Sequence, residues 1–197
     1  QKRKDVSIDV IEKSDEFIEA FKYIVPTFAS DISLNLNQII HDDLSSFVPK
    51  TLASYTMITC QNVFAELVNY SPLDKMNLLM QYVQFLSDDG LLILVEPAEL
   101  RHSTELRVLQ KELENAGLFL YGPCVHIQKG ICQPEKCWSF VELPRFKPTR
   151  LMKLLSGENE SFRFMNTDIK FSYSILTKKP RNSLPSKIPL HNTISLR

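Results

Sequence analysis

The chain has 197 residues, of which 44% are hydrophobic and 23% charged, the composition of a globular protein with enough residues for one cored domain. The net charge is zero, because 23 Lys and Arg residues balance 23 Asp and Glu residues. This balance excludes a global electrostatic field that would attract the protein to nucleic acid or membrane. No apolar run approaches the roughly 20 residues that span a bilayer. The charged start lacks a signal peptide and an initiator Met, so we expect a piece of a longer protein.

The chain predicts alternating strands and helices. Short apolar or alternating runs indicate strands at Val6–Ile11, Leu34–Ile40, Tyr55–Cys60, Leu91–Val95, Leu118–Tyr121 and Phe171–Thr177. Apolar residues at helical spacing indicate helices from Asp15 to Pro26, over 63–68, from Pro72 to Leu86 before Asp88-Asp89-Gly90, and over 103–115 before Gly117. This alternation predicts an α/β fold, with a mostly parallel sheet and helices on both faces.

The end of the chain differs from the rest in composition. After Lys179 come three prolines, Pro180, Pro185 and Pro189, among scattered Ser and Asn. This composition predicts an extended arm or linker. We therefore expect one α/β domain over 1–179 and a tail over 180–197.

Polar residues follow several of the predicted strands. They are Glu12, Asp42 with Asp43, Gln61 with Asn62, and Glu96. Ligands of parallel α/β sheets bind beyond the carboxyl ends of the strands. We therefore expect a ligand crevice at this edge of the sheet.

The stretch over 121–140 holds three of the four cysteines. Cys124, Cys132 and Cys137 have the spacing Cys-x7-Cys-x4-Cys, with His126 two residues after the first. Interspersed Pro and Gly predict a compact loop, in which such thiolates can converge on a metal ion or an iron–sulfur cluster. A disulfide with a spare thiol and a set of buried thiols are the alternatives, although four cysteines are few for a disulfide scaffold. The spacing does not choose the ion.

Several motifs together resemble a known family. They are Leu-Val-Glu-Pro at 94–97, Gly-Pro-Cys-Val-His at 122–126, Cys132, Cys137-Trp-Ser-Phe at 137–140, and Lys-Phe-Ser-Tyr-Ser-Ile-Leu at 170–176. The pattern is similar to that of the methyltransferase-like assembly factors of the mitochondrial small ribosomal subunit and their bacterial and archaeal relatives. The resemblance covers about residues 6–177, and is specific at the cysteine loop and at Lys-Phe-Ser-Tyr.

The resemblance implies a class I methyltransferase fold and S-adenosylmethionine at the strand ends. It also implies a four-iron four-sulfur cluster on Cys124, Cys132 and Cys137, with zinc as the alternative. The implied partners are ribosomal RNA and ribosomal proteins of the small subunit, without a membrane or a disulfide-linked partner. The implied compartment is the mitochondrial matrix, or the cytoplasm in bacterial or archaeal relatives.

The chain also departs from the family pattern. Four motif positions differ from the family: this chain has Val125 and Gln133 where the family has Pro, Trp138 where it has His, and Ala98 where it has Gly. No Cys follows Cys137, so the fourth ligand lies beyond Arg197, is His126 or Cys60, or the cluster is lost. Of these, we expect Cys60 to be a crevice residue rather than a ligand.

The glycine-rich loop of a methyltransferase is missing, because no Gly occurs in residues 1–89. We therefore expect Val6–Ile11 to be the second strand of the fold, with the first strand and its loop lying before Gln1 or dispensed with. The resemblance then assigns Glu12 to the cofactor ribose, Asp43 or Asp42 to the adenine edge, and Gln61 with Asn62 to the methionine end. The Asn-Pro-Pro-Tyr motif is absent, which leaves the reaction type open.

Two functions follow as hypotheses, with a zinc-stabilised α/β domain as a weaker third. The first is a ribosome-associated assembly or structural protein on a methyltransferase fold, and the alternative is an active methyltransferase acting on RNA. RNA would contact a local basic surface, with Phe146 or Trp138 stacking on a base. We expect that surface to unite two groups of residues, which are Arg145, Lys147, Arg150 and Lys153 after the cysteine loop, and Lys178 and Lys179 after the last strand.

Overall fold

The computed structural model describes residues 5–28, 33–47, 54–124, 133–145, 147, 149–150, 168–183 and 192–196. Its strands are β1 (Asp5–Glu12), β2 (Ser33–His41), β3 (Tyr55–Gln61), β4 (Leu86–Pro97), β5 (Phe119–Gly122), β6 (Val141–Glu142), β7 (Lys170–Thr177) and β8 (Asn192–Leu196). Its helices are α1 (Asp15–Phe28), α2 (Val63–Glu66), α3 (Pro72–Val83) and α4 (Leu100–Asn115), with short 3-10 turns η2 (Pro134–Lys136) and η4 (Arg181–Ser183). None of these helices is long and apolar enough to cross a bilayer.

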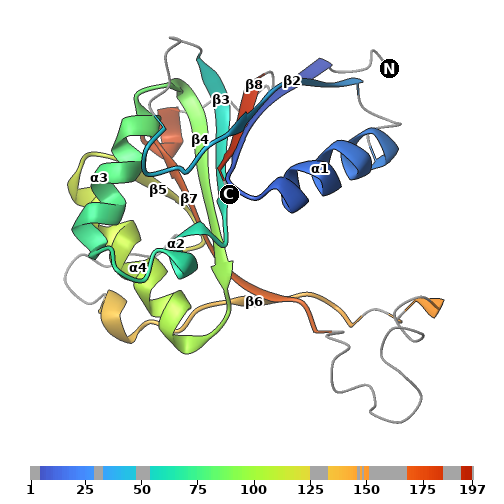
Figure 1. The fold of residues 1–197 in the computed structure, drawn as a ribbon. Helices are drawn as coiled ribbons and strands as arrows, with labels where there is room; N and C mark the ends of the chain where they lie inside the picture. The colour runs from blue at the N-terminus through green and yellow to red at the C-terminus, as the bar shows by residue number, and fades with distance from the viewer. Residues whose placement is uncertain are drawn as a thin grey trace.

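The strands form one sheet, in the order β2-β1-β8-β3-β4-β7-β5, and β6 pairs with β7 outside this path (Figure 1). β2, β1, β8, β3 and β4 are parallel, whereas β7 is antiparallel to β4, β5 and β6. The predicted α/β class with a mostly parallel sheet is therefore confirmed. Counted from β8 as position one, the parallel part has the 3-2-1-4-5 order of a doubly wound sheet.

Helices cover both faces of the sheet, as the alternation predicted. Figure 1 shows α1 on one side of the sheet, and α3 and α4 together on the other. The two crossovers explain this arrangement, because β1-α1-β2 and β3-α3-β4 run in opposite directions from β8. Right-handed crossovers of opposite direction place their helices on opposite faces.

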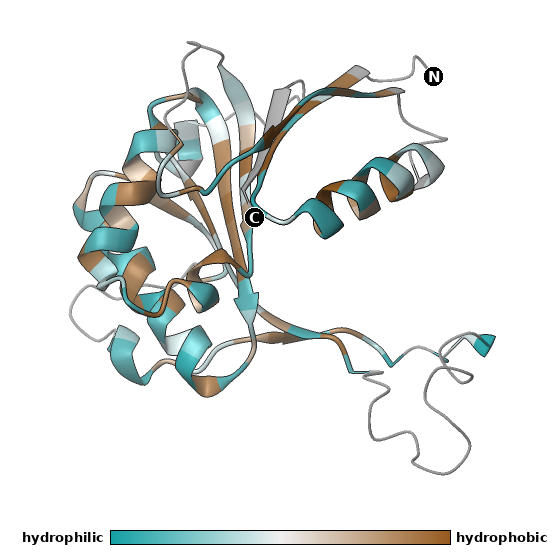
Figure 2. Ribbon diagram, in the orientation of Figure 1, coloured by the Kyte–Doolittle hydropathy of each residue, from teal (hydrophilic) through white to brown (hydrophobic). Residues whose placement is uncertain are grey.

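The main core lies between the sheet and the layer of α3 and α4. Leu92 and Leu94 of β4 are fully buried against Leu79 of α3 and Leu106 and Leu109 of α4. Figure 2 shows the corresponding brown, hydrophobic colour along β4 and on the inner sides of these helices. The other face of β4 is only half-buried, at Leu91, Ile93 and Val95. Among the described helices, the one on that side, α1, packs beside β1 and β2.

The start of β4 differs from the prediction. We expected a helix through Leu86 with a stop at Asp88-Asp89-Gly90, but α3 ends at Val83 and Leu86 already belongs to the sheet. Two contacts favour the strand here. Leu86 is buried in the core, and the Phe85 carbonyl accepts a hydrogen bond of 2.8 Å from Tyr55 N–H. Asp88, Asp89 and Gly90, where we expected the helix to stop, lie in the irregular stretch of β4 between the pairs Tyr55–Leu86 and Met57–Leu91.

The end of the chain also differs from the prediction. The tail over 180–197 was expected to lie outside the domain, yet β8 occupies the centre of the sheet. Ile194 pairs with Asp9 of β1 on one side and with Ile58 of β3 on the other. β8 thus fills the position of the first strand, which we expected before Gln1 or missing.

Candidate functional site

Three of the five predicted cofactor residues line one cavity. Glu12 ends β1, Gln61 ends β3, and Asn62 follows it; together with Lys13, Ser14, Phe17 and Glu66 they enclose about 250 Å³. The last residue of β8, Leu196, pairs with both Ile11 and Cys60, so the cavity lies at the carboxyl end of β8. This is where the strand order reverses, the position at which doubly wound sheets bind ligands.

Glu12 brings a buried carboxylate to the cavity wall. Its side chain is only 6% exposed, and its Oε1 accepts a hydrogen bond of 2.8 Å from Ser14 N–H. That bond fixes the turn from β1 into α1. A carboxylate at this place can accept hydrogen bonds from the hydroxyls of a ribose.

The opposite wall is a strained turn. Asn62 has the left-handed φ of 58°, and its N–H donates to the carbonyl of Val95 at 2.8 Å. Asn tolerates this conformation better than most residues, which explains why the turn from β3 into α2 carries it. At the mouth of the cavity Glu66 forms an exposed ion pair with Lys13, at 3.8 Å.

The structure does not bring Asp42 and Asp43 into this cavity. Asp43 Oδ1 accepts from the N–H and the hydroxyl of Ser45, at 2.8 and 2.6 Å, and these hydrogen bonds lower the pKa of its carboxyl group. Asp42 Oδ1 accepts from the Ser46 hydroxyl at 2.9 Å. Both carboxylates therefore organise the turn after β2. The sequence reveals acids after a strand, but not which partners those acids take.

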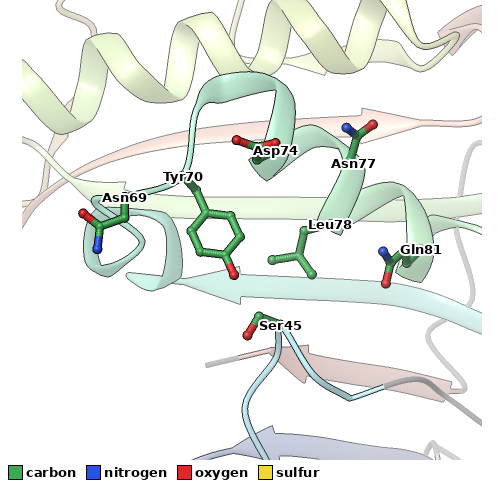
Figure 3. A pocket seen from close by; sticks show the side chains of 7 residues that line it. All are labelled: Ser45, Asn69, Tyr70, Asp74, Asn77, Leu78 and Gln81. Atoms are coloured by element: carbon green, nitrogen blue, oxygen red, sulfur yellow. The ribbon is translucent and has the colours of Figure 1, made fainter.

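A second cavity of about 370 Å³ lies between that turn and α3 (Figure 3). Figure 3 shows Ser45 facing Tyr70 and Leu78 across it, with Asp74, Asn77 and Gln81 along the helix and Asn69 before it. The carboxylate of Asp74 is already engaged, because it forms a capping box with Ser71. None of the predicted site residues lines this cavity.

Glu96, one of the polar residues at the predicted strand ends, has contacts that the sequence did not reveal. Glu96 lies near the end of β4 and is only 2% exposed. Its two carboxylate oxygens accept hydrogen bonds from the N–H groups of Phe64 and Ala65, at 3.0 and 2.9 Å. Lys75, itself 5% exposed, donates to the Phe64 carbonyl at 2.9 Å. The only sequence signal was an acid after a buried apolar run, which did not reveal these partners.

The cysteines divide into two groups. Cys60 is fully buried, and burial raises the pKa of its thiol well above the usual value, so it is a neutral core residue. The expectation that Cys60 lies in the crevice is therefore wrong, because its strand turns that side chain towards the helix layer. Cys124 and Cys137 both lie beside the buried guanidinium of Arg107. Burial lowers the pKa of this guanidinium, and the two thiols act in the opposite direction.

The predicted metal site is only partly within the described residues. Cys132 and His126 lie outside them. Within the part of the chain that the structure describes, no three His, Cys, Asp or Glu side chains gather as metal ligands. The convergence of all three cysteines therefore stays a prediction.

Among the described residues, Arg145 of the first predicted basic group lies apart from Lys178 and Lys179 of the second. Arg145 pairs with Asp168 at 2.7 Å, just before β7 begins, whereas Lys178 and Lys179 follow its other end. The eight residues of β7 lie between them and span roughly 26 Å, at about 3.3 Å per residue. Lys178 donates to the Leu86 carbonyl, and Lys179 pairs with Asp88 and Asp89 at 3.5 and 3.1 Å.

Arg145 and the two lysines therefore lie near opposite ends of β7, and a surface that unites the two whole groups stays a prediction. Lys153 lies outside the described residues, while Lys147 and Arg150 lie within them. Trp138 is 55% exposed, and its Nε1 donates to the Ala98 carbonyl at 2.8 Å. Ribosomal RNA as a partner stays a prediction from the sequence resemblance.

Comparisons with known proteins give matches in structure alone. No protein-family profile and no curated protein matches the sequence. An S-adenosylmethionine-dependent methyltransferase from Clostridium acetobutylicum ATCC 824 is 7% identical with a TM-score of 0.47, over 88% of this chain and 83% of its own.

The plantazolicin methyltransferase BpumL is similar in two solved structures. With a monoazolic desmethylPZN analog and SAH, it is 12% identical with a TM-score of 0.45, over 91% of this chain and 77% of its own. With SAH, it is 11% identical with a TM-score of 0.43, over the same 91% and 77%. At these identities and TM-scores, any likeness concerns the fold alone.

Proposed function

We propose that this domain binds S-adenosylmethionine in the cavity between β1 and β3, as a methyltransferase-like domain. The observation that carries the proposal is the meeting of Glu12, Gln61 and Asn62 at the point where the strand order reverses. Glu12 would accept the hydroxyls of the ribose. Gln61 and Asn62, on the other side of β8, would face the amino-acid end of the cofactor.

The test is a calorimetric titration with S-adenosylhomocysteine. We expect Glu12→Gln to raise the Kd roughly tenfold or more, because one charge-assisted acceptor contributes about 1.5–3 kcal/mol. The Gln side chain keeps an oxygen for Ser14 N–H, so the turn should survive. Glu16→Gln, an exposed carboxylate on α1, is the matched control and should bind like the wild type. A wild-type chain that binds no S-adenosylhomocysteine, or equal affinities for all three proteins, would contradict the proposal.

A second candidate function is metal or cluster binding by the cysteine loop, and one observation favours it. Arg107 is a buried cation, 3% exposed, and its neighbours include the thiols of Cys124 and Cys137. Buried charges need partners, and thiolates of a metal centre would supply the negative charge. We infer that these two cysteines, together with Cys132, hold an iron–sulfur cluster or a zinc ion that stabilises the loop.

Elemental analysis of the purified chain tests this inference. An iron–sulfur cluster should give iron together with acid-labile sulfide, whereas a zinc site should give zinc alone. Cys124→Ser and Cys137→Ser should each lose most of the bound metal, because each removes one ligand. Cys60→Ala is the control that should keep it, since Cys60 is a buried core thiol. Metal-free wild-type protein, or full metal content in either serine variant, would exclude the site.

A further inference from the structure

Two buried side chains of opposite charge hold the short helix α2. Glu96 comes from the end of β4 and accepts the N–H groups of Phe64 and Ala65, while Lys75 comes from α3 and donates to the Phe64 carbonyl. A helix of four residues is too short to be stable by itself. Its conformation therefore depends on these contacts.

Helix α2 connects two residues of the cofactor cavity. Asn62 precedes it and Glu66 ends it, and both line the cavity. Asn62 is also tied to β4 directly, through the hydrogen bond from its N–H to the carbonyl of Val95, the residue before Glu96. A change at Glu96 is therefore transmitted to the cavity wall through one helical turn.

We propose that Glu96 is a positioning residue, and that the loss of a proton from its carboxyl group is coupled to cofactor binding. Its ionised carboxylate accepts two N–H groups and holds α2 against the cavity. Its protonation converts one acceptor oxygen into an O–H donor that faces an N–H group, so one of the two hydrogen bonds is lost and the turn loosens. This inference rests on the proposed binding of S-adenosylmethionine.

The surroundings of Glu96 place this proton transfer near neutral pH. Burial raises the pKa of Glu96 to about 7, although the N–H groups of Phe64 and Ala65 and the charge of Lys75 act to lower it. Glu105 of α4 adds to the rise, and it pairs with Lys75 at 3.4 Å. The other titratable groups at this place are Cys60 of β3 and His102 of α4.

The sign of the pH dependence follows from this shift. The cofactor-binding form holds the ionised carboxylate, so binding should release a proton and tighten as the pH rises through about 7. Stability changes in the opposite direction. The folded pKa lies above the unfolded value, so this contribution to stability is complete below the unfolded pKa and is lost as the pH rises through about 7.

Calorimetry with S-adenosylhomocysteine at pH 6, 7 and 8 tests the coupling. For the wild type we expect the Kd to fall roughly tenfold from pH 6 to pH 8, because the binding-competent fraction rises by that factor. Titrations in phosphate and in Tris, whose ionisation heats differ, should reveal the released proton. Glu96→Gln should bind more weakly, without this pH dependence or proton release. Glu16→Gln, an exposed carboxylate on α1 away from Glu96, should behave like the wild type.

Two results separate this inference from the proposed function. Binding that is tight but independent of pH would overturn the coupling and leave the proposed function standing, whereas no binding at any pH would overturn the proposed function. An independent measurement is the pH titration of the amide proton shifts of Phe64 and Ala65 without ligand. A midpoint near 7 in the wild type and a flat response in Glu96→Gln support the positioning role. Flat shifts in the wild type overturn it.

Discussion

Ile194→Pro should lower the free energy of unfolding by about 3 kcal/mol or more, because it removes a backbone N–H from the centre of the sheet and leaves its acceptor unpaired. Ile194 lies in β8, between Asp9 of β1 and Ile58 of β3. In the described sheet β1 and β3 do not pair with each other, so β8 joins its two halves. Urea unfolding followed by circular dichroism measures the change.

Ile194→Val is the matched control for this prediction. It keeps the N–H group and the β-branched shape, so we expect a cost of no more than about 1 kcal/mol. The proline variant should also lose S-adenosylhomocysteine binding, since β8 ends beneath the cavity. A proline variant as stable as the valine variant would mean that residues 192–196 do not form the central strand.

Arg107→Ala should cost about 3–5 kcal/mol, because it removes a buried guanidinium together with its hydrogen bonds to Gln110, Ser172 and Tyr173. The guanidinium donates to Gln110 Oε1 at 2.6 Å, to the Ser172 hydroxyl at 3.1 Å and to the Tyr173 carbonyl. These contacts join α4 to β7, and the neighbouring thiols of Cys124 and Cys137 connect them to the cysteine loop. Thermal and urea unfolding of the purified variant measure the loss.

Two variants show whether the effect belongs to the buried network. Arg101→Ala removes an exposed arginine of the same helix, whose ion pair with Glu105 is screened by solvent and should contribute little to stability. Arg107→Lys keeps the charge but lacks the planar fork of donors, so we expect it to recover only part of the loss. If Arg107→Ala were no more destabilising than Arg101→Ala, the network would not hold the loop and sheet together.

The sequence predicts best where local chemistry decides. Glu12 lies at the end of β1 and Gln61 at the end of β3 as expected, because an apolar β-branched run followed by a polar residue defines the end of a buried strand. The cavity formed by these ends then follows from the parallel order of the strands.

The remaining features depend on contacts between distant segments. Glu96 has its role through Phe64 and Lys75, which belong to other elements, and Arg107 looks like a solvated helical arginine until α4 packs on β7. The short segment 192–196 follows a proline-rich stretch and carries no strong strand signal. Its assignment as a strand comes from its pairing with both β1 and β3.

The central position of β8 also has a kinetic consequence. Ser7 pairs with Asn192, so closing the sheet requires contact between residues near opposite ends of this sequence. Contacts at such separation raise the relative contact order, and domains dominated by them fold in milliseconds to seconds rather than microseconds. The β3-α3-β4 and β1-α1-β2 units can each form from neighbouring segments, whereas joining them requires β8. Refolding should therefore be slow, with the joining of the two halves by β8 as its late step.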